Sequence, residues 1–167
     1  MKQHDLVAEK GMVEIHFSTI SRLEQYVTDS WTGVGRERTI SREDIATFGT
    51  LTENEQWIHV DQERCQNESI YGDIIAHGFF ILTLIPSLLP PEPFQVVGHA
   101  HRIVRGSDSF RFLNPVYPGD TVCARTRLVN VQAASSGKGV ILHREIELIV
   151  PKRKVTVVTC TLMLQYF

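Results

Sequence analysis

Two short clusters in the sequence carry side chains that could move a proton at neutral pH. The first is FGTLTENEQWIHVD, residues 48–61, which contains His59. The second is IAHGF, residues 75–79, in which His77 directly precedes Gly78. A histidine titrates near neutrality and can exchange a proton with water. A glycine lets a ligand approach the backbone N–H, which can stabilise negative charge on an oxygen. The two clusters are therefore the candidate positions for chemistry in this chain.

The elements that position these clusters are expected to be helices. Ser41 is followed three residues later by an acid, which predicts a capped helix over residues 42–51. Asp61 predicts the cap of a second helix, over residues 62–67. Residues 73–88 predict the most apolar helix of the chain, hydrophobic on nearly all sides and hence enclosed by other structure. Gly78 inside it costs about 1 kcal/mol relative to alanine, so a close approach of another chain or a ligand is expected there.

The second half of the chain changes to the alternation that is typical of strands. We expect strands over residues 94–104, 109–112, 121–132, 139–149 and 155–165. A buried helix followed by long antiparallel strands predicts an α+β fold in which a sheet wraps around that helix. We expect one domain over residues 1–167, with residues 1–35 as an N-terminal helical extension that includes a segment capped by Ser18 or Thr19.

Three ordered segments resemble the MaoC-like family of (R)-specific enoyl-CoA hydratases. The run F-x-x-L-T-x6-H-x-D of residues 48–61 is followed by IAHG and then by RFLNPVYPGDTV, residues 111–122. QWIHVD and IAHGF are most similar to the nodulation-N-like branch of that family. The resemblance implies a hotdog fold, in which an antiparallel sheet is wrapped around a long central apolar helix. It also implies a homodimer or a dimer of dimers that uses no cofactor and no metal.

The activity implied by this resemblance is hydration of a trans-2-enoyl thioester to the (R)-3-hydroxyacyl thioester, or the reverse dehydration. The acyl group would be carried by coenzyme A or by an acyl carrier protein. In the family, an Asp and a His with the spacing D-x4-H move the protons of a water. The histidine corresponds to His59, and the glycine whose N–H polarises the thioester carbonyl corresponds to Gly78. His77 is expected beside it in the substrate-binding part of the site, where it orients the loop or caps the helix.

The sequence departs from the family pattern where the catalytic aspartate is expected. That position holds Asn54, preceded by Glu53 where the family often has glycine. An asparagine can orient a water but cannot accept a proton, and losing an acid/base partner costs a factor of about 10²–10⁴ in rate. Three alternatives follow. His59 acts as the sole base with Asn54 orienting the water, or Glu53 or Glu55 replaces the carboxylate, or the domain binds acyl thioesters without efficient turnover.

Composition narrows the remaining function classes. The net charge of −2 gives no argument for nucleic-acid binding, and the longest apolar stretch is too short to span a membrane. Three widely spaced cysteines and an N-terminus without a signal peptide's apolar centre favour a cytoplasmic protein with reduced thiols. His99 and His101 have no third ligand at a diagnostic spacing, so no metal site is expected.

A thioesterase is the third functional alternative. The candidate clamps for a coenzyme phosphate are Arg102, Arg105, Arg111, Arg125 and Arg127.

Overall fold

The elements of the fold are taken from a computed structural model, which describes residues 12–135, 137 and 139–167. In chain order they are β1 Val13–His16, α1 Ile20–Glu24, β2 Arg38–Thr39, α2 Arg42–Leu51, α3 Trp57–Val60, α4 Gln62–Glu68, α5 Gly78–Thr83, α6 Ile85–Leu88, β3 Phe94–Val97, β4 Arg102–Phe112, β5 Thr121–Ala133, β6 Val140–Val150, the 3-10 helix η1 Pro151–Arg153, and β7 Val155–Tyr166.

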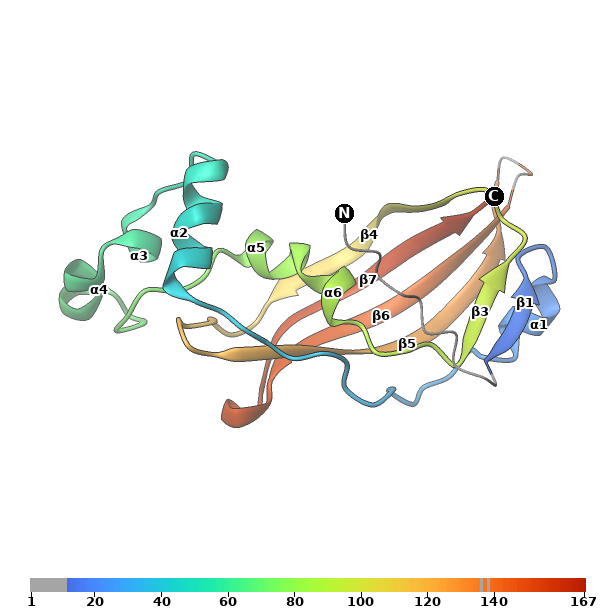
Figure 1. Cartoon of the computed structure of the whole chain (residues 1–167), viewed down its shortest axis with the longest axis horizontal. Helices are drawn as coiled ribbons and strands as arrows, with labels where there is room; N and C mark the ends of the chain where they lie inside the picture. The colour runs from blue at the N-terminus through green and yellow to red at the C-terminus, as the bar shows by residue number, and fades with distance from the viewer. Residues whose placement is uncertain (1–11, 136, 138) are drawn as a thin grey trace, which may run out of the picture.

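Five of the strands form one sheet with the order β2-β5-β6-β7-β4, and all of its neighbours are antiparallel. A separate parallel pair joins β1 to β3. The long strands run diagonally across Figure 1, with α5 and α6 lying against their concave face and α2, α3 and α4 gathered at one end. This is the α+β arrangement expected from the sequence, with the sheet curled around the apolar segment.

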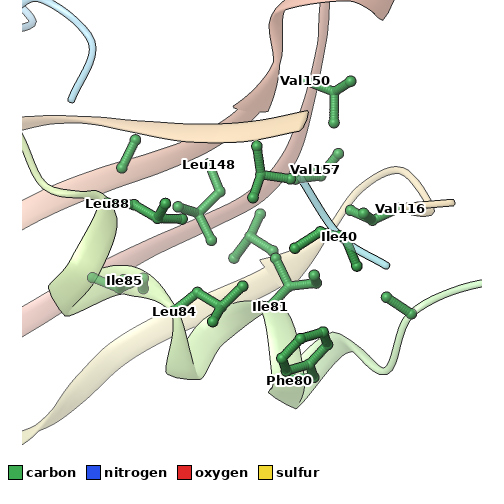
Figure 2. Packing of buried hydrophobic residues seen from close by; sticks show 14 of the residues in the cluster. Ile40, Phe80, Ile81, Leu84, Ile85, Leu88, Val116, Leu148, Val150 and Val157 are labelled. Carbon is green, nitrogen blue, oxygen red and sulfur yellow. The ribbon is translucent and has the colours of Figure 1, made fainter. Parts of the chain in front are cut away.

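The main core lies between α5–α6 and the sheet. Figure 2 shows side chains of the two helices, among them Ile81 and Leu84, packed toward Leu148 and Val157 of the strands. Every second residue of β6, from 142 to 150, is buried on this side of the sheet. A strand with one buried face takes this period of two, because successive side chains point to opposite faces. Four of the five are aliphatic and one, Arg144, is charged.

The two edges of the sheet differ in whether another segment of the chain bonds to them. Along β5, residues 28–35 donate backbone hydrogen bonds from Thr28, Thr32 and Gly35 to carbonyls of the strand, and β2 continues the cover. The outer edge of β4 has no pairing strand within the described residues. Because an unpaired edge is a template for further pairing, β4 is the side on which another chain can add.

The two capped helices predicted from the sequence are confirmed. α2 begins after Ser41, whose side chain accepts from the N–H of Asp44 while the Asp44 carboxylate accepts from the Ser41 N–H. α4 begins after Asp61, whose carboxylate accepts from the N–H of Arg64 at 3.0 Å.

The prediction of one helix over residues 73–88 is wrong at its start and in its continuity. The helix begins at Gly78, because the preceding backbone is committed elsewhere: Ile75 N–H donates to Ile58 O at 3.1 Å and Ala76 N–H donates to Val116 O at 2.7 Å. It is interrupted at Leu84, before Pro86 in the first turn of α6. Proline has no N–H with which to continue the helical ladder.

Two further boundaries differ from expectation. The strand expected over residues 94–104 is divided into β3 and β4 at Gly98, whose φ of +79° bends the chain out of the extended conformation. His99 and His101 therefore lie in a connection and not on one strand face. Within residues 1–35, the described part contains α1, which has five residues, and also β1, while residues 1–11 lie outside the described residues.

Candidate active site

His59 lies in the short helix α3 with only 8% of its surface exposed. Its Nδ1 is 2.7 Å from the carbonyl oxygen of Ile75. A carbonyl oxygen can only accept, so Nδ1 carries the proton and donates it to this bond. The bond thereby fixes the neutral tautomer in which Nε2 keeps its lone pair.

Burial lowers the pKa of His59 below its ordinary value of 6.5. The hydrogen bond to Ile75 acts in the opposite direction and raises the pKa, while the nearby His77 ring lowers it further. The lowering prevails, because the charged imidazolium loses more solvation in this setting than the single hydrogen bond restores. His59 is therefore neutral at neutral pH, and Nε2 is available as a proton acceptor.

His77 holds the loop before His59 in place. Its Nε2 donates to the backbone oxygen of Asn54 at 2.8 Å, and its ring stacks on that of His59 with 3.7 Å between centroids. The rings of His77 and Phe48 are 5.2 Å apart, which places this pair against α2. His77 is the N-cap residue of α5 but makes no side-chain capping bond. His77 was expected either to orient the loop or to cap the helix. The structure shows the hydrogen bond to the loop and no side-chain cap.

Gly78 is the first residue of α5, and its backbone is closely approached by β4. A Cβ at this position would lie 2.6 Å from a ring carbon of Phe112. The close approach expected at this glycine is therefore present, and the neighbour is an aromatic ring from the sheet edge. The N–H of a first helical residue has no acceptor within its own helix.

Two hollows meet at Gly78. The histidine hollow, about 310 Å³, is lined by Phe48, Thr52, Asn54, His59, His77, Gly78 and Phe79. The apolar hollow, about 270 Å³, is lined chiefly by Ile75, Ala76, Ile81, Phe112, Val116, Val157 and Val158, together with His59, Gly78 and Phe79. Both hollows are therefore lined by His59 and by Gly78.

The structure brings Asn54, His59, His77 and Gly78 around the histidine hollow, but not the two glutamates. Glu53 and Glu55 are exposed, and neither lines either hollow. Glu55 is engaged by Thr50, whose hydroxyl donates to its carboxylate at 2.9 Å. Glu53 has a φ of +52°, the left-handed conformation that glycine adopts without strain. This conformation gives a physical reason for the glycine that the family often has there.

Several lining residues were not singled out as site residues from the sequence. Phe79 and Phe112 form the rim at Gly78, with 5.9 Å between their ring centroids. Phe79 is 61% exposed, so the helix is not enclosed on all sides as its composition suggested. Phe112 does stand in RFLNPVYPGDTV, the segment of residues 111–122 that resembles the family. That resemblance is the signal that the sequence offers for Phe112, although it does not say which face of the strand the ring occupies.

Two of the five arginines proposed as phosphate clamps are already engaged. Arg125 pairs with Glu147 and Arg127 with Glu145, and both guanidinium groups lie over the ring of Trp31. The other three, Arg102, Arg105 and Arg111, are exposed on β4 and form no ion pair within the described residues.

The three cysteines are free and buried, and burial raises the pKa of the Cys160 thiol to about 11.

In the part of the chain that the structure describes, no three His, Cys, Asp or Glu side chains are grouped so that they could hold a metal ion. None of the described helices has the length and apolar character needed to cross a membrane.

The family model described as "MaoC like domain" matches residues 29–147 of the chain. The chain belongs to the MaoC-like family. It is 35% identical over 120 residues to nodulation protein N of Rhizobium meliloti, with 68% of each chain covered. It is 38% identical over 99 residues to 3-hydroxyacyl-thioester dehydratase Z of Mycobacterium tuberculosis, covering 59% of this chain. The match covers 64% of that dehydratase, which is less than two thirds of its length.

The fold is also found in solved structures. The (R)-hydratase from A. caviae involved in PHA biosynthesis superposes with a TM-score of 0.61, with 20% identity, over 82% of this chain and 98% of the hydratase chain. At this identity the likeness concerns the fold alone. It confirms the hotdog fold expected from the sequence motifs.

Proposed function

We propose that this MaoC-like protein is an (R)-specific hydratase or dehydratase of 2-enoyl thioesters. One observation carries the proposal: the imidazole of His59, held by Ile75 in the tautomer with a lone pair on Nε2, and Gly78, the first residue of α5, belong to residues that line the same two hollows. The first group can take a proton from water, and the second can stabilise a developing oxyanion. The names of the dehydratase and hydratase relatives support the same class of reaction.

The chemical step needs no group beyond these two and a water molecule. The thioester oxygen accepts a hydrogen bond from the Gly78 N–H while the water oxygen bonds to the β-carbon of the enoyl group. His59 Nε2 takes the proton that the water loses, and the double-bond electrons move toward the thioester oxygen. The imidazolium then returns the proton to the α-carbon, which restores neutral His59. Dehydration is the reverse sequence.

The apolar hollow suits the acyl chain of such a substrate. Its lining is mainly aliphatic and aromatic, and it begins at the glycine where the thioester would be held. Coenzyme A and an acyl carrier protein present the same thioester, so both are candidate carriers. Arg102, Arg105 and Arg111 on the neighbouring β4 are the clamps for a carrier phosphate that no carboxylate already occupies within the described residues.

The second candidate is an acyl-thioester-binding subunit with impaired catalysis, and Asn54 is the observation that favours it. Asn54 lines the histidine hollow and stands where the family has a carboxylate. Replacement of that carboxylate by Glu53 or Glu55 is disfavoured, because neither lines either hollow and Glu55 is held by Thr50. We therefore assign the proton transfer to His59 and the orientation of the water to Asn54.

We further propose that two copies associate through the open edge of β4. Phe79, Phe110 and Phe112 form a cluster of edge-on and tilted ring contacts beside this edge, and all three are substantially exposed. A second copy that pairs with β4 would satisfy the edge and cover these rings. It would also complete the rim of the hollow at Gly78.

The test is hydration of crotonyl-CoA and longer 2-enoyl-CoA homologues, followed by the absorbance of the conjugated thioester. We expect turnover by the wild type, a loss of about 10²–10⁴-fold in His59→Ala, and a gain of about tenfold or more in Asn54→Asp, where the carboxylate is restored. Asn54→Gln is the matched control, because it keeps the amide and adds no base.

The outcomes separate the two candidates. Activity that appears only in Asn54→Asp would identify the wild-type chain as the binding subunit. Turnover that persists at the wild-type rate in His59→Ala would exclude His59 as the base and overturn the proposed mechanism.

A further inference from the structure

Beyond the end of α6 lies a larger hollow that neither His59 nor Gly78 lines. This arginine hollow has a volume of about 620 Å³, within the range of small-molecule sites. Its apolar lining includes Ile85, Leu89, Phe94, Ile146, Leu162 and Leu164. Its charged lining, among the described residues, consists of Arg102, Arg144 and Glu92. Two arginines against one carboxylate leave an excess of positive charge in an apolar cavity.

Arg144 is the unusual residue of this hollow. It occupies a core-facing position of β6, with the apolar Leu128 and Leu162 opposite it on the two neighbouring strands. Only 3% of its surface is exposed. Burying a charge is costly unless the group is paired and hydrogen-bonded, and an aliphatic residue at this position would avoid that cost.

Arg144 forms an ion pair but keeps a buried donor without a partner in the described chain. Its Nη1 donates to Glu92 at 2.6 Å, and Glu92 is itself partly exposed. Its Nε is buried and has no partner among the residues that the structure describes. A guanidinium presents five N–H donors in a planar fork that matches a carboxylate. Nδ1 of His99, which lines the same hollow, is also buried and unpartnered within the described chain.

A second hollow, mainly apolar, adjoins this one. This middle hollow of about 240 Å³ shares Ile85, Pro86, Val104 and Leu162 with the arginine hollow, so the two are neighbours. Its lining is almost wholly apolar, with Leu82, Phe110 and Cys160 farther along. On β7, residues 160, 162, 164 and 166 line the two hollows in order, as expected for one face of a strand. An apolar hollow thus lies next to the cationic one along the same face of β7.

We infer that the arginine hollow binds a carboxylate that carries an extended apolar chain. The carboxylate accepts from Nε of Arg144, and the chain follows β7 into the middle hollow. Two sources share this chemistry: a free fatty-acid-like carboxylate, and the distal carboxyl group of a dicarboxylic acyl thioester. The first does not depend on the proposed reaction, whereas the second rests on it and would define its substrate class.

The test is titration calorimetry with dodecanoate below its micelle-forming concentration, with dodecanol as the uncharged probe of the same chain length. We expect dodecanoate to bind the wild type more tightly than dodecanol. Arg144→Lys should weaken dodecanoate binding about tenfold or more, because it keeps a charge but loses the planar fork. Glu92→Gln should tighten it, because it removes the carboxylate that competes for Arg144.

The matched controls use an ion pair outside the hollow. Arg127→Lys and Glu145→Gln make the same two changes in the Arg127–Glu145 pair, and they should leave dodecanoate binding unchanged. Equal binding of dodecanoate and dodecanol would overturn the inference. So would failure of dodecanoate to bind, or equal effects of the hollow and control variants. Thermal unfolding of each variant in parallel identifies any that does not fold, and Glu92→Gln then still tests the site by a gain.

The source of the carboxylate is decided by turnover. A wild-type preference for an ω-carboxy 2-enoyl-CoA over the plain homologue, lost in Arg144→Lys, would assign the hollow to the distal end of the substrate. Dodecanoate binding that persists in His59→Ala, without such a preference, would assign it to a free carboxylate. Absence of all turnover would contradict the proposed function but leave the calorimetric result valid.

Discussion

At the start of α5 the buried polar side chains are two stacked imidazoles, whereas beyond the end of α6 a buried arginine is paired with a partly exposed glutamate. The imidazoles donate to backbone carbonyls, Ile75 for His59 and Asn54 for His77. The guanidinium donates to a side chain and retains a buried donor with no partner in the described chain. Both groups line hollows against the same sheet.

We call the start of α5, with His59 and His77, the histidine end, and the region beyond α6, with Arg144 and Glu92, the arginine end. The histidine end is suited to proton transfer, whereas the arginine end is suited to the recognition of charge. An imidazole whose tautomer is fixed by a carbonyl can gain and release a proton at neutral pH. A guanidinium keeps its charge under all such conditions and can only bind. The histidine end should therefore govern catalysis with little effect on stability, and the arginine end should govern stability and ligand binding.

The largest expected effect is on stability at the arginine end. Arg144→Leu should lower the free energy of unfolding by about 3 kcal/mol, because it leaves Glu92 without its partner beside an apolar cavity. The double variant Arg144→Leu/Glu92→Leu should recover most of this loss, since no unpaired charge remains. Urea denaturation measures both. A double variant as unstable as the single one would show that packing, and not the charge, holds this end together.

At the histidine end, Gly78→Ala should reduce kcat/KM for 2-enoyl-CoA hydration about tenfold or more while unfolding changes by less than about 1 kcal/mol. The added methyl displaces the Phe112 ring and crowds the N–H that binds the thioester oxygen. The control is Gly106→Ala on β4, where a Cβ makes only an ordinary contact with Met163 at 3.5 Å. Equal losses of activity in the two variants would exclude a specific role for the Gly78 N–H.

The two ends should also differ in their response to pH. Because burial lowers the pKa of His59 below 6.5, its imidazole is neutral above that value, and kcat/KM should fall only as the pH drops further. Stability follows the same direction: the unfolded state takes up the proton first as the pH falls through 6.5, so this contribution is lost toward acid. His59→Gln should remove the acidic loss of stability. An activity limb centred above pH 6.5 would contradict a lowered pKa.

The smallest effect concerns the loop beside the histidine hollow. Glu53→Gly should raise the free energy of unfolding by about 0.5 kcal/mol, because glycine relieves the left-handed conformation at the cost of some unfolded-state entropy. Activity should be unchanged, since Glu53 lines neither hollow. A loss of hydration activity in Glu53→Gly would instead indicate that this carboxylate takes part in the reaction.

The sequence by itself determined the elements whose signals are local. Ser41 and Asp61 cap helices where their spacing predicted, because a side chain and the N–H two or three residues later belong to one turn. The alternation of apolar residues in β5, β6 and β7 predicted long strands. The resemblance of residues 48–61 and of IAHG to the family predicted that His59 and Gly78 share a site. These inferences needed only neighbours along the chain or a resemblance carried by the motifs.

Only the tertiary structure decided where long-range contacts override local preference. Residues 73–77 have the composition of a helix, yet the N–H groups of Ile75 and Ala76 bond to the carbonyls of Ile58 and Val116, far away in sequence. Exclusion of Glu53 and Glu55 from the hollow depends on how the loop folds back onto His77. Arg144 stood in the sequence as a charge in a core-facing row of β6, but the cavity that surrounds it exists only once α6, β3 and β7 are assembled.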